Sequence, residues 1–282
     1  MHALPASFGL RTAEAVQKYG PLCAGIDPSG DLLRSWGLTD DVAGLRAFCA
    51  ACIEGFSGTV AIVKPQVAFF ERHGSAGLAE LERLLSLARQ AELLVLADAK
   101  RGDIDSTAAA YADAWLGPHS PLAADAVTAH PYLGLAALAP MLDLAGQQGR
   151  GVVVVVRSSN PEGRSLQQAV TGTGLAVEDA LLTEIADWNT SDRVPVGTIG
   201  AVIGATLEPS AFPLAQLGGV ILAPGLGAQG AGPADVAARF AGLPLGSVIA
   251  STSRGLLAAG PDPTELRQAA RELNEKLASL MG

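Results

Sequence analysis

The sequence predicts a single domain, residues 1–282, folded as a (β/α)8 TIM barrel. Three observations lead to this prediction. Eight short apolar segments recur along the chain, longer helical stretches separate them, and 282 residues suffice for eight such units. Regular alternation of strands and helices favours a parallel sheet with helices outside it. An open doubly wound sheet is the alternative that the same alternation allows.

The expected strands are apolar on both faces, which suits a buried parallel sheet better than a half-exposed antiparallel one. Between them, residues 78–90 place apolar side chains at helical spacing, and residues 48–56 also indicate a helix. The expected strands are residues 22–27, 60–65, 93–98, 125–130, 151–158, 200–205, 219–224 and 247–252.

Composition argues against several classes of protein. The formal net charge is −9 and the basic residues are scattered, which argues against binding to nucleic acid or to a membrane surface. We find no segment apolar and long enough to span a membrane, and no signal-peptide pattern at the N-terminus. Cys23, Cys49 and Cys52 are few and odd in number, so we expect buried, reduced thiols in a cytoplasmic protein.

Polar side chains stand at or just after the carboxyl end of most expected strands. In a barrel these ends converge on one mouth, where the active sites of barrel enzymes lie. The sequence therefore predicts a functional site there. The residues are Asp27, Lys64, Asp98, His130, Ser158, Ser159, Thr206 and Arg254.

The segment DAKRGD, residues 98–103, places Lys100 between two carboxylates, Asp98 and Asp103. In an extended segment Asp98 and Lys100 point to the same side, and Gly102 lets the chain turn into the next helix. An ammonium group flanked by carboxylates stays protonated, which suits a general acid but not Schiff-base chemistry. The structural alternative is a buried ion-pair network that holds one end of the barrel together.

Read as D-x-K-x-x-D-I-x-x-T, residues 98–107 resemble the signature of the orotidine 5′-phosphate decarboxylase family. Six further segments resemble that family's other motifs in the same order, so the resemblance covers nearly the whole chain. The first two of them look most like the branch found in mycobacteria and related bacteria. The six are GIDPS (25–29), VKPQVAFFE (63–71), SNP (159–161), GAT (204–206), PGLGAQG (224–230) and STSRG (251–255).

The resemblance implies that orotidine 5′-phosphate loses CO2 to give UMP, the last step of pyrimidine nucleotide synthesis, without a cofactor or metal. Fixed charge must then stabilise the carbanion at C6, because no carbonyl group is placed to accept the electrons. By similarity, Lys100 protonates C6, and Lys64 completes an alternating charge array. Asp98, together with the partner subunit's Asp103, would lie beside the leaving carboxylate.

The resemblance also implies binding roles and a homodimer with shared active sites. Asp27 would bind a ribose hydroxyl, Thr107 would reach the ribose of the other subunit, and Ser159 would bind the pyrimidine. Gln229 and Arg254 would hold the phosphate. This fits a barrel, in which the loops after strands seven and eight commonly form a phosphate site.

Several alternatives stay open at this point. GLGAQG (225–230) formally matches a dinucleotide-binding motif, but it lies near the end of the chain and the next strand lacks the expected acid. A magnesium-dependent sugar-phosphate decarboxylase, such as 3-keto-L-gulonate 6-phosphate decarboxylase, shares D-x-K-x-x-D but would need a carboxylate in place of Lys64. A non-catalytic UMP sensor would have no use for the charge array. His130 is more typical of a structural residue, and residues 159–174 form either a lid or a tolerated insertion.

Overall fold

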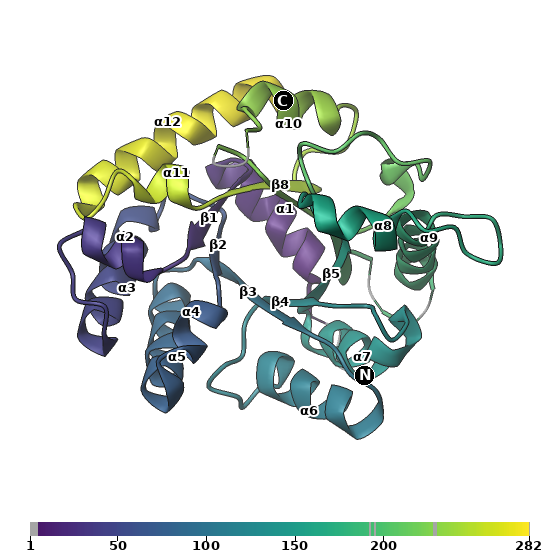
Figure 1. Ribbon diagram of the computed structural model, residues 1–282, viewed down its shortest axis with the longest axis horizontal. Coiled ribbons are helices and arrows are strands. Elements are labelled where there is room, and N and C mark those ends of the chain that lie inside the picture. The colour runs from purple at the N-terminus through teal and green to yellow at the C-terminus, as the bar shows by residue number, and fades with distance from the viewer. Residues whose placement is uncertain (1–4, 192, 195, 228–229, 282) are drawn as a thin grey trace.

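Eight parallel strands close into a barrel in the order β1 to β8 (Figure 1), which confirms the predicted fold. The computed structural model describes residues 5–191, 193–194, 196–227 and 230–281. β1 pairs with both β2 and β8, so the sheet is not an open one. The strands are β1 Leu22–Ile26, β2 Ile62–Pro65, β3 Leu94–Arg101, β4 Ala126–Ala129, β5 Gly151–Arg157, β6 Ile199–Ile203, β7 Ile221–Pro224 and β8 Val248–Thr252.

Helices surround the barrel (Figure 1). Their local sequences explain which face each helix buries and where each helix begins. α5 buries Leu81, Leu84 and Leu85 at the spacing of one helix face. α3 begins after Asp41, whose carboxylate accepts a hydrogen bond from the Gly44 amide at 2.9 Å. The helices are α1 Phe8–Tyr19, α2 Gly30–Ser35, α3 Val42–Phe56, α4 Ala68–Glu71, α5 Gly74–Gln90, α6 Asp105–Leu116, α7 Ala139–Gln148, α8 Arg164–Gln167, α9 Val177–Thr190, α10 Pro233–Arg239, α11 Arg254–Leu257 and α12 Pro263–Met281, with 3₁₀ turns η1 Leu135–Leu138, η2 Pro161–Gly163 and η3 Leu214–Gln216.

The interior of the barrel is packed with side chains. Each of the eight strands contributes at least one buried residue to a cluster that also includes Phe8 and Val16 of α1. Successive strand residues alternate between two cores: Cys23 belongs to this inner cluster, whereas Leu22 and Ala24 belong to the larger cluster shared with the helices. Both faces of the sheet are therefore buried, as the apolar strands predict.

α1 closes the amino-terminal end of the barrel. Its first residue, Phe8, is fully buried, and the Gly9 amide donates to the carbonyl of Gly197 at 3.0 Å, just before β6. A side chain at Gly9 would collide with this backbone, since a Cβ there would lie 2.7 Å from the Gly197 Cα. Arg11 forms an ion pair with Asp125, just before β4. α1 therefore covers the end of the barrel opposite the predicted site.

The strand that carries Lys100 differs from the prediction. We expected a strand over residues 93–98, but β3 continues to Arg101. Between two of its pairings with β4, β3 advances four residues while β4 advances two, so β3 contains a bulge. Lys100 lies in this bulge with a φ of 50°, in the left-handed region. The expectation of a plainly extended segment from Asp98 to Lys100 is therefore wrong.

Other features agree with the sequence or refine it. All three cysteines are buried and free, as predicted. The connection 159–174 is not wholly irregular, because it contains η2 and α8. Within the described ranges, no helix combines the length and apolarity needed to cross a bilayer.

Candidate active site

Asp98 lies at the centre of a charged cluster at the carboxyl ends of β2 and β3. Its Oδ1 accepts a hydrogen bond from Lys100 Nζ at 2.6 Å, and its Oδ2 accepts one from Lys64 Nζ at 3.1 Å. Lys64 belongs to β2 and the other two residues to β3, and these strands are neighbours in the barrel. The fold thus brings together three of the four predicted catalytic residues.

Lys64 and Asp98 are almost completely buried. Burial alone would lower the pKa of Lys64, but the carboxylates of Asp98 and Asp27 outweigh it and raise that pKa well above its usual range. Burial alone would raise the pKa of Asp98, but the ammonium groups of Lys64 and Lys100 hold it well below its usual range. Both members of the buried pair therefore stay charged at neutral pH.

Lys100 differs from Lys64 in its accessibility. The Lys100 side chain is 41% exposed, whereas that of Lys64 is 9% exposed. Its ammonium group is held by Asp98 and can still be reached by a bound molecule. This arrangement suits transfer of a proton to a ligand in the barrel mouth.

Asp27, directly after β1, has a buried carboxylate oxygen without a partner. Within the described part of the chain, no group donates a hydrogen bond to its Oδ1. Such an oxygen is costly to bury, because it has lost its water without gaining a donor. Its position fits a residue that receives a hydroxyl donor from a bound molecule.

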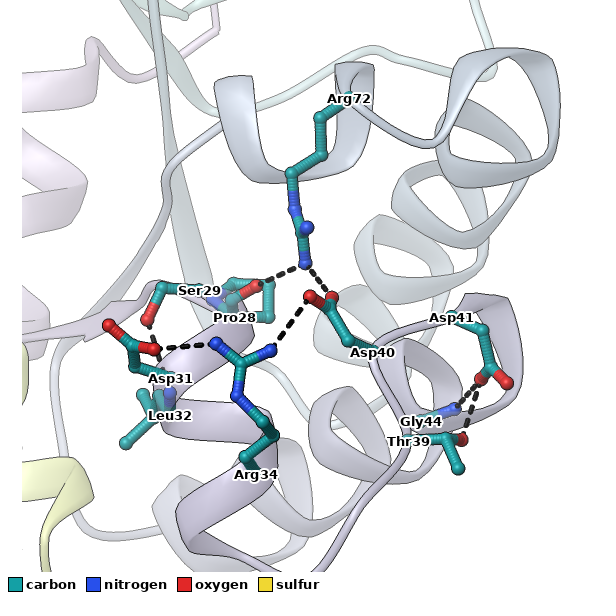
Figure 2. A network of polar contacts seen from close by, with 10 residues as sticks. All are labelled: Pro28, Ser29, Asp31, Leu32, Arg34, Thr39, Asp40, Asp41, Gly44 and Arg72. Atoms are coloured by element: carbon teal, nitrogen blue, oxygen red, sulfur yellow. Dashed lines mark hydrogen bonds and ion pairs between the residues drawn. The ribbon is translucent and has the colours of Figure 1, made fainter.

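A polar network fixes the loop that follows Asp27 (Figure 2). Arg72, just after α4, pairs with Asp40 and donates to the carbonyl of Pro28 at 3.5 Å. Arg34 of α2 reaches the other oxygen of Asp40 at 3.3 Å. The network therefore joins the segments that follow β1 and β2.

A cavity of about 330 Å³ lies beside the carboxyl ends of β5 and β6. Three of the predicted mouth residues line it: Ser158, Ser159 and Thr206. So do Arg157 and Glu178, whose Nε and Oε2 lie 2.8 Å apart in a buried ion pair, although they are not aligned for a hydrogen bond. A second cavity, of about 290 Å³, is lined mostly by apolar groups such as Leu10 of α1 and contains none of the predicted site residues.

Comparison with known proteins identifies the family. Residues 20–270 match the family described as "Orotidine 5'-phosphate decarboxylase / HUMPS family". The chain belongs to this family. It is 52% identical over 234 residues to the orotidine 5′-phosphate decarboxylase of Salinispora tropica. The matched region covers 83% of this chain and 84% of that protein. It is 50% identical over 264 residues to that of Streptomyces coelicolor, covering 93% of this chain and 94% of the relative. These actinobacterial relatives agree with the predicted branch.

Solved structures of the orotidine 5′-phosphate decarboxylase family have the same fold. A crystal structure described as a candidate orotidine 5′-phosphate decarboxylase from Streptomyces avermitilis is 46% identical, with a TM-score of 0.93, covering 99% of this chain and 97% of that one. The OMP decarboxylase of Leishmania donovani is 30% identical, with a TM-score of 0.77, covering 98% and 99%.

Asp103 and Thr107 lie apart from the charged cluster. Asp103 precedes α6 and accepts a hydrogen bond from the Ile104 amide at 2.8 Å, and Thr107 is exposed in the first turn of α6. Asp103 forms no ion pair with Lys100 within the described chain. The family signature assigns both residues to the neighbouring subunit, which stays a prediction.

Of the two predicted phosphate residues, the structure describes Arg254, which lies near the end of β8. Arg254 is exposed at the first position of α11, two residues after the end of β8. Gln229 lies outside the described residues. On either side of it, Gly227 and Gly230 have φ values of 82° and 96°, which side chains rarely adopt, so the loop requires glycine there.

Sequence reasoning missed two residues that contact Asp98. Thr128 of β4 donates to its Oδ1 at 2.8 Å, and Gln66, just after β2, donates from Nε2 to its Oδ2 at 3.1 Å. Thr128 is the polar residue inside the apolar run DAVTAH, and Gln66 follows Lys64 within the VKPQ motif. For Thr128, a polar residue within an apolar strand was the available signal.

Gly102 is required for a different reason than predicted. Its φ is not positive; instead, a Cβ there would lie 2.4 Å from the carbonyl oxygen of His130, so the close approach of this main chain excludes a side chain.

Burial and the charge of Lys100 lower the pKa of His130, which favours its neutral form. Among the described residues, no group of three or more His, Cys, Asp or Glu is placed to hold a metal ion.

Proposed function

We propose that this chain, acting as one domain over residues 1–282, decarboxylates orotidine 5′-phosphate to UMP and CO2 without a cofactor or metal. The observation that carries the proposal is the Asp98 carboxylate bonded to both Lys64 and Lys100 at the barrel mouth. Membership of the family supports the substrate. The free thiols are in keeping with a cytoplasmic location, and the net charge of −9 disfavours nucleic acid as a partner.

The reaction breaks the bond between C6 and the carboxylate carbon, and the electron pair stays on C6 as CO2 leaves. The Lys100 ammonium group stabilises this developing negative charge. It then transfers a proton to C6, which forms the C–H bond of UMP and leaves a neutral amine. Solvent returns the proton to the amine.

Asp98 prepares the site for this step. Its pKa is held low, so it is ionised and would face the substrate carboxylate as a second negative charge. Loss of neutral CO2 relieves this repulsion, whereas binding alone does not, so the interaction favours the transition state over the bound substrate. Lys64, buried beneath a bound substrate, keeps the Asp98 carboxylate in place.

The remaining predicted residues bind the nucleotide. The unpartnered Oδ1 of Asp27 accepts a ribose hydroxyl, and Ser159, at the edge of the β5–β6 cavity, binds the pyrimidine. Arg254 presents a guanidinium fork for the phosphate, and Gln229 shares that role. Asp27, Ser159 and Arg254 follow β1, β5 and β8, so they would surround a ligand whose base lies over Lys100.

We also propose a homodimer in which each subunit supplies Asp103 and Thr107 to the other's site. Three apolar side chains close to these residues support this: Ile104, Tyr132 and Leu133 are all largely exposed. They lie on the loops after β3 and β4, which approach each other at Gly102. A twofold interface here would cover them and bring the same pair to each site.

A spectrophotometric assay for loss of orotidine 5′-phosphate, with and without EDTA, tests the proposed activity. We expect conversion to UMP at the same rate in both. Activity on a sugar phosphate that EDTA abolishes would support the magnesium-dependent alternative instead. Binding of UMP without any turnover of orotidine 5′-phosphate would support a sensor.

A further inference from the structure

Thr128 connects the two residues at the centre of the site. It lies in β4, is fully buried, and points its hydroxyl group at β3. The hydroxyl oxygen accepts a hydrogen bond from the main-chain amide of Lys100 at 2.9 Å. The same hydroxyl group donates to Oδ1 of Asp98 at 2.8 Å.

The direction of these two hydrogen bonds follows from chemistry. An amide N–H can only donate, so the Thr128 oxygen must accept from Lys100. An ionised carboxylate can only accept, so the single hydroxyl proton must point to Asp98. The hydroxyl therefore has a defined orientation and joins the main chain of Lys100 to the side chain of Asp98.

The main chain of Lys100 needs such support. Its φ of 50° is uncommon for a residue with a side chain, and it occurs within the bulge of β3. Uncommon main-chain conformations persist only where surrounding contacts hold them. The bulge brings the main-chain amide of Lys100 to the Thr128 hydroxyl group. It also brings Lys100 Nζ to within 2.6 Å of Asp98 Oδ1.

We propose that Thr128 is a positioning residue for decarboxylation, and that its hydroxyl group fixes the bulge so that the Lys100 ammonium points at the reacting carbon. The inference rests on the proposed function. Thr128 acts through Lys100 and Asp98, because its buried hydroxyl group donates its one proton to Asp98 and accepts from the Lys100 amide. Its loss should therefore affect the chemical step more than nucleotide binding.

Thr128→Val tests this, because valine keeps the shape and removes only the hydroxyl group. We expect kcat to fall about 10- to 100-fold, the factor that corresponds to losing hydrogen bonds to charged groups. KM and the calorimetric affinity for UMP should stay close to the wild-type values, since Asp27 and Arg254 are untouched. Thr128→Ser, which keeps the hydroxyl group, should restore most of kcat.

Two comparisons separate positioning from simple loss of structure. Thr12→Val is the matched control: Thr12 is also fully buried, but its hydroxyl has no hydrogen-bond partner in the described chain, so kcat should not change. Thr128→Ser and Thr128→Ala both lack the methyl group and differ only in the hydroxyl. Serine should therefore be the faster of the two, even if the valine variant fails to fold.

The outcomes are distinct. If folded Thr128→Val keeps wild-type kcat, or if the serine and alanine variants turn over equally fast, the inference is wrong. If the wild-type chain itself does not convert orotidine 5′-phosphate to UMP, the proposed function fails instead, and that result is seen before any variant is made.

Discussion

Replacement of Asp98 by asparagine should destabilise the fold as well as stop the reaction. Asparagine has nearly the same shape, so the change removes mainly one negative charge. Lys64, whose side chain is 9% exposed, would then keep a buried ammonium group without its hydrogen-bonded carboxylate. Asp27 contributes a favourable charge to Lys64, but the structure shows no hydrogen bond between the two.

Breaking one half of a buried ion pair costs about 3–5 kcal/mol in the free energy of unfolding. For a domain of this size, that loss corresponds to a Tm lower by about 6–10 °C. Differential scanning calorimetry at pH 7 measures it directly. Asp31→Asn is the matched control, because Asp31 pairs with Arg34 on the surface with its side chain 96% exposed, and such pairs add little.

The effect of Asp98→Asn should depend on pH in a defined direction. The pKa of Asp98 is lower in the folded chain than in the unfolded one. Its contribution to the free energy of unfolding is therefore fully present above the ordinary Asp pKa and is lost as the pH falls. The Tm difference between wild type and variant should therefore narrow below about pH 5. A variant that melts within about 1 °C of the wild type at pH 7 would show that the pair does not stabilise the fold.

Two further predictions concern the phosphate site and the dimer. Arg254→Ala should lower kcat/KM strongly, and added guanidinium should restore much of the activity because it replaces a discrete group; wild-type kinetics in the variant would place the phosphate elsewhere. Lys100→Ala and Asp103→Ala should each be inactive, but mixing and refolding them should recover about a quarter of the wild-type activity, since about half the dimers are mixed and each has one intact site. If mass spectrometry detects mixed dimers and no activity returns, Asp103 acts within its own subunit.

The barrel and the central charged residues could be predicted because each rests on a local pattern. Eight buried segments alternating with helices define the fold, and strand ends in a barrel meet at one mouth. Lys64 and Asp98 were therefore expected near each other without any pairwise information. The structure adds their direct contact at 3.1 Å and their burial.

The missed features depend on how neighbouring strands pair and on how closely their main chains approach. No single segment of the sequence encodes either property. The left-handed conformation of Lys100 arises from a bulge whose position depends on how β3 pairs with β4. The contact of Thr128 with Asp98 depends on the same register. Gly102 looked like a turn residue, because the sequence does not show that the His130 carbonyl passes beside it.

The most direct test of the central claim is the kcat of Lys100→Ala together with its affinity for UMP. Removal of the proton donor should reduce kcat to less than a few per cent of the wild-type value, while calorimetry shows that UMP still binds and circular dichroism shows an intact fold. A variant that folds, binds UMP and keeps more than a few per cent of the wild-type kcat would contradict the assignment of Lys100 as the group that protonates C6.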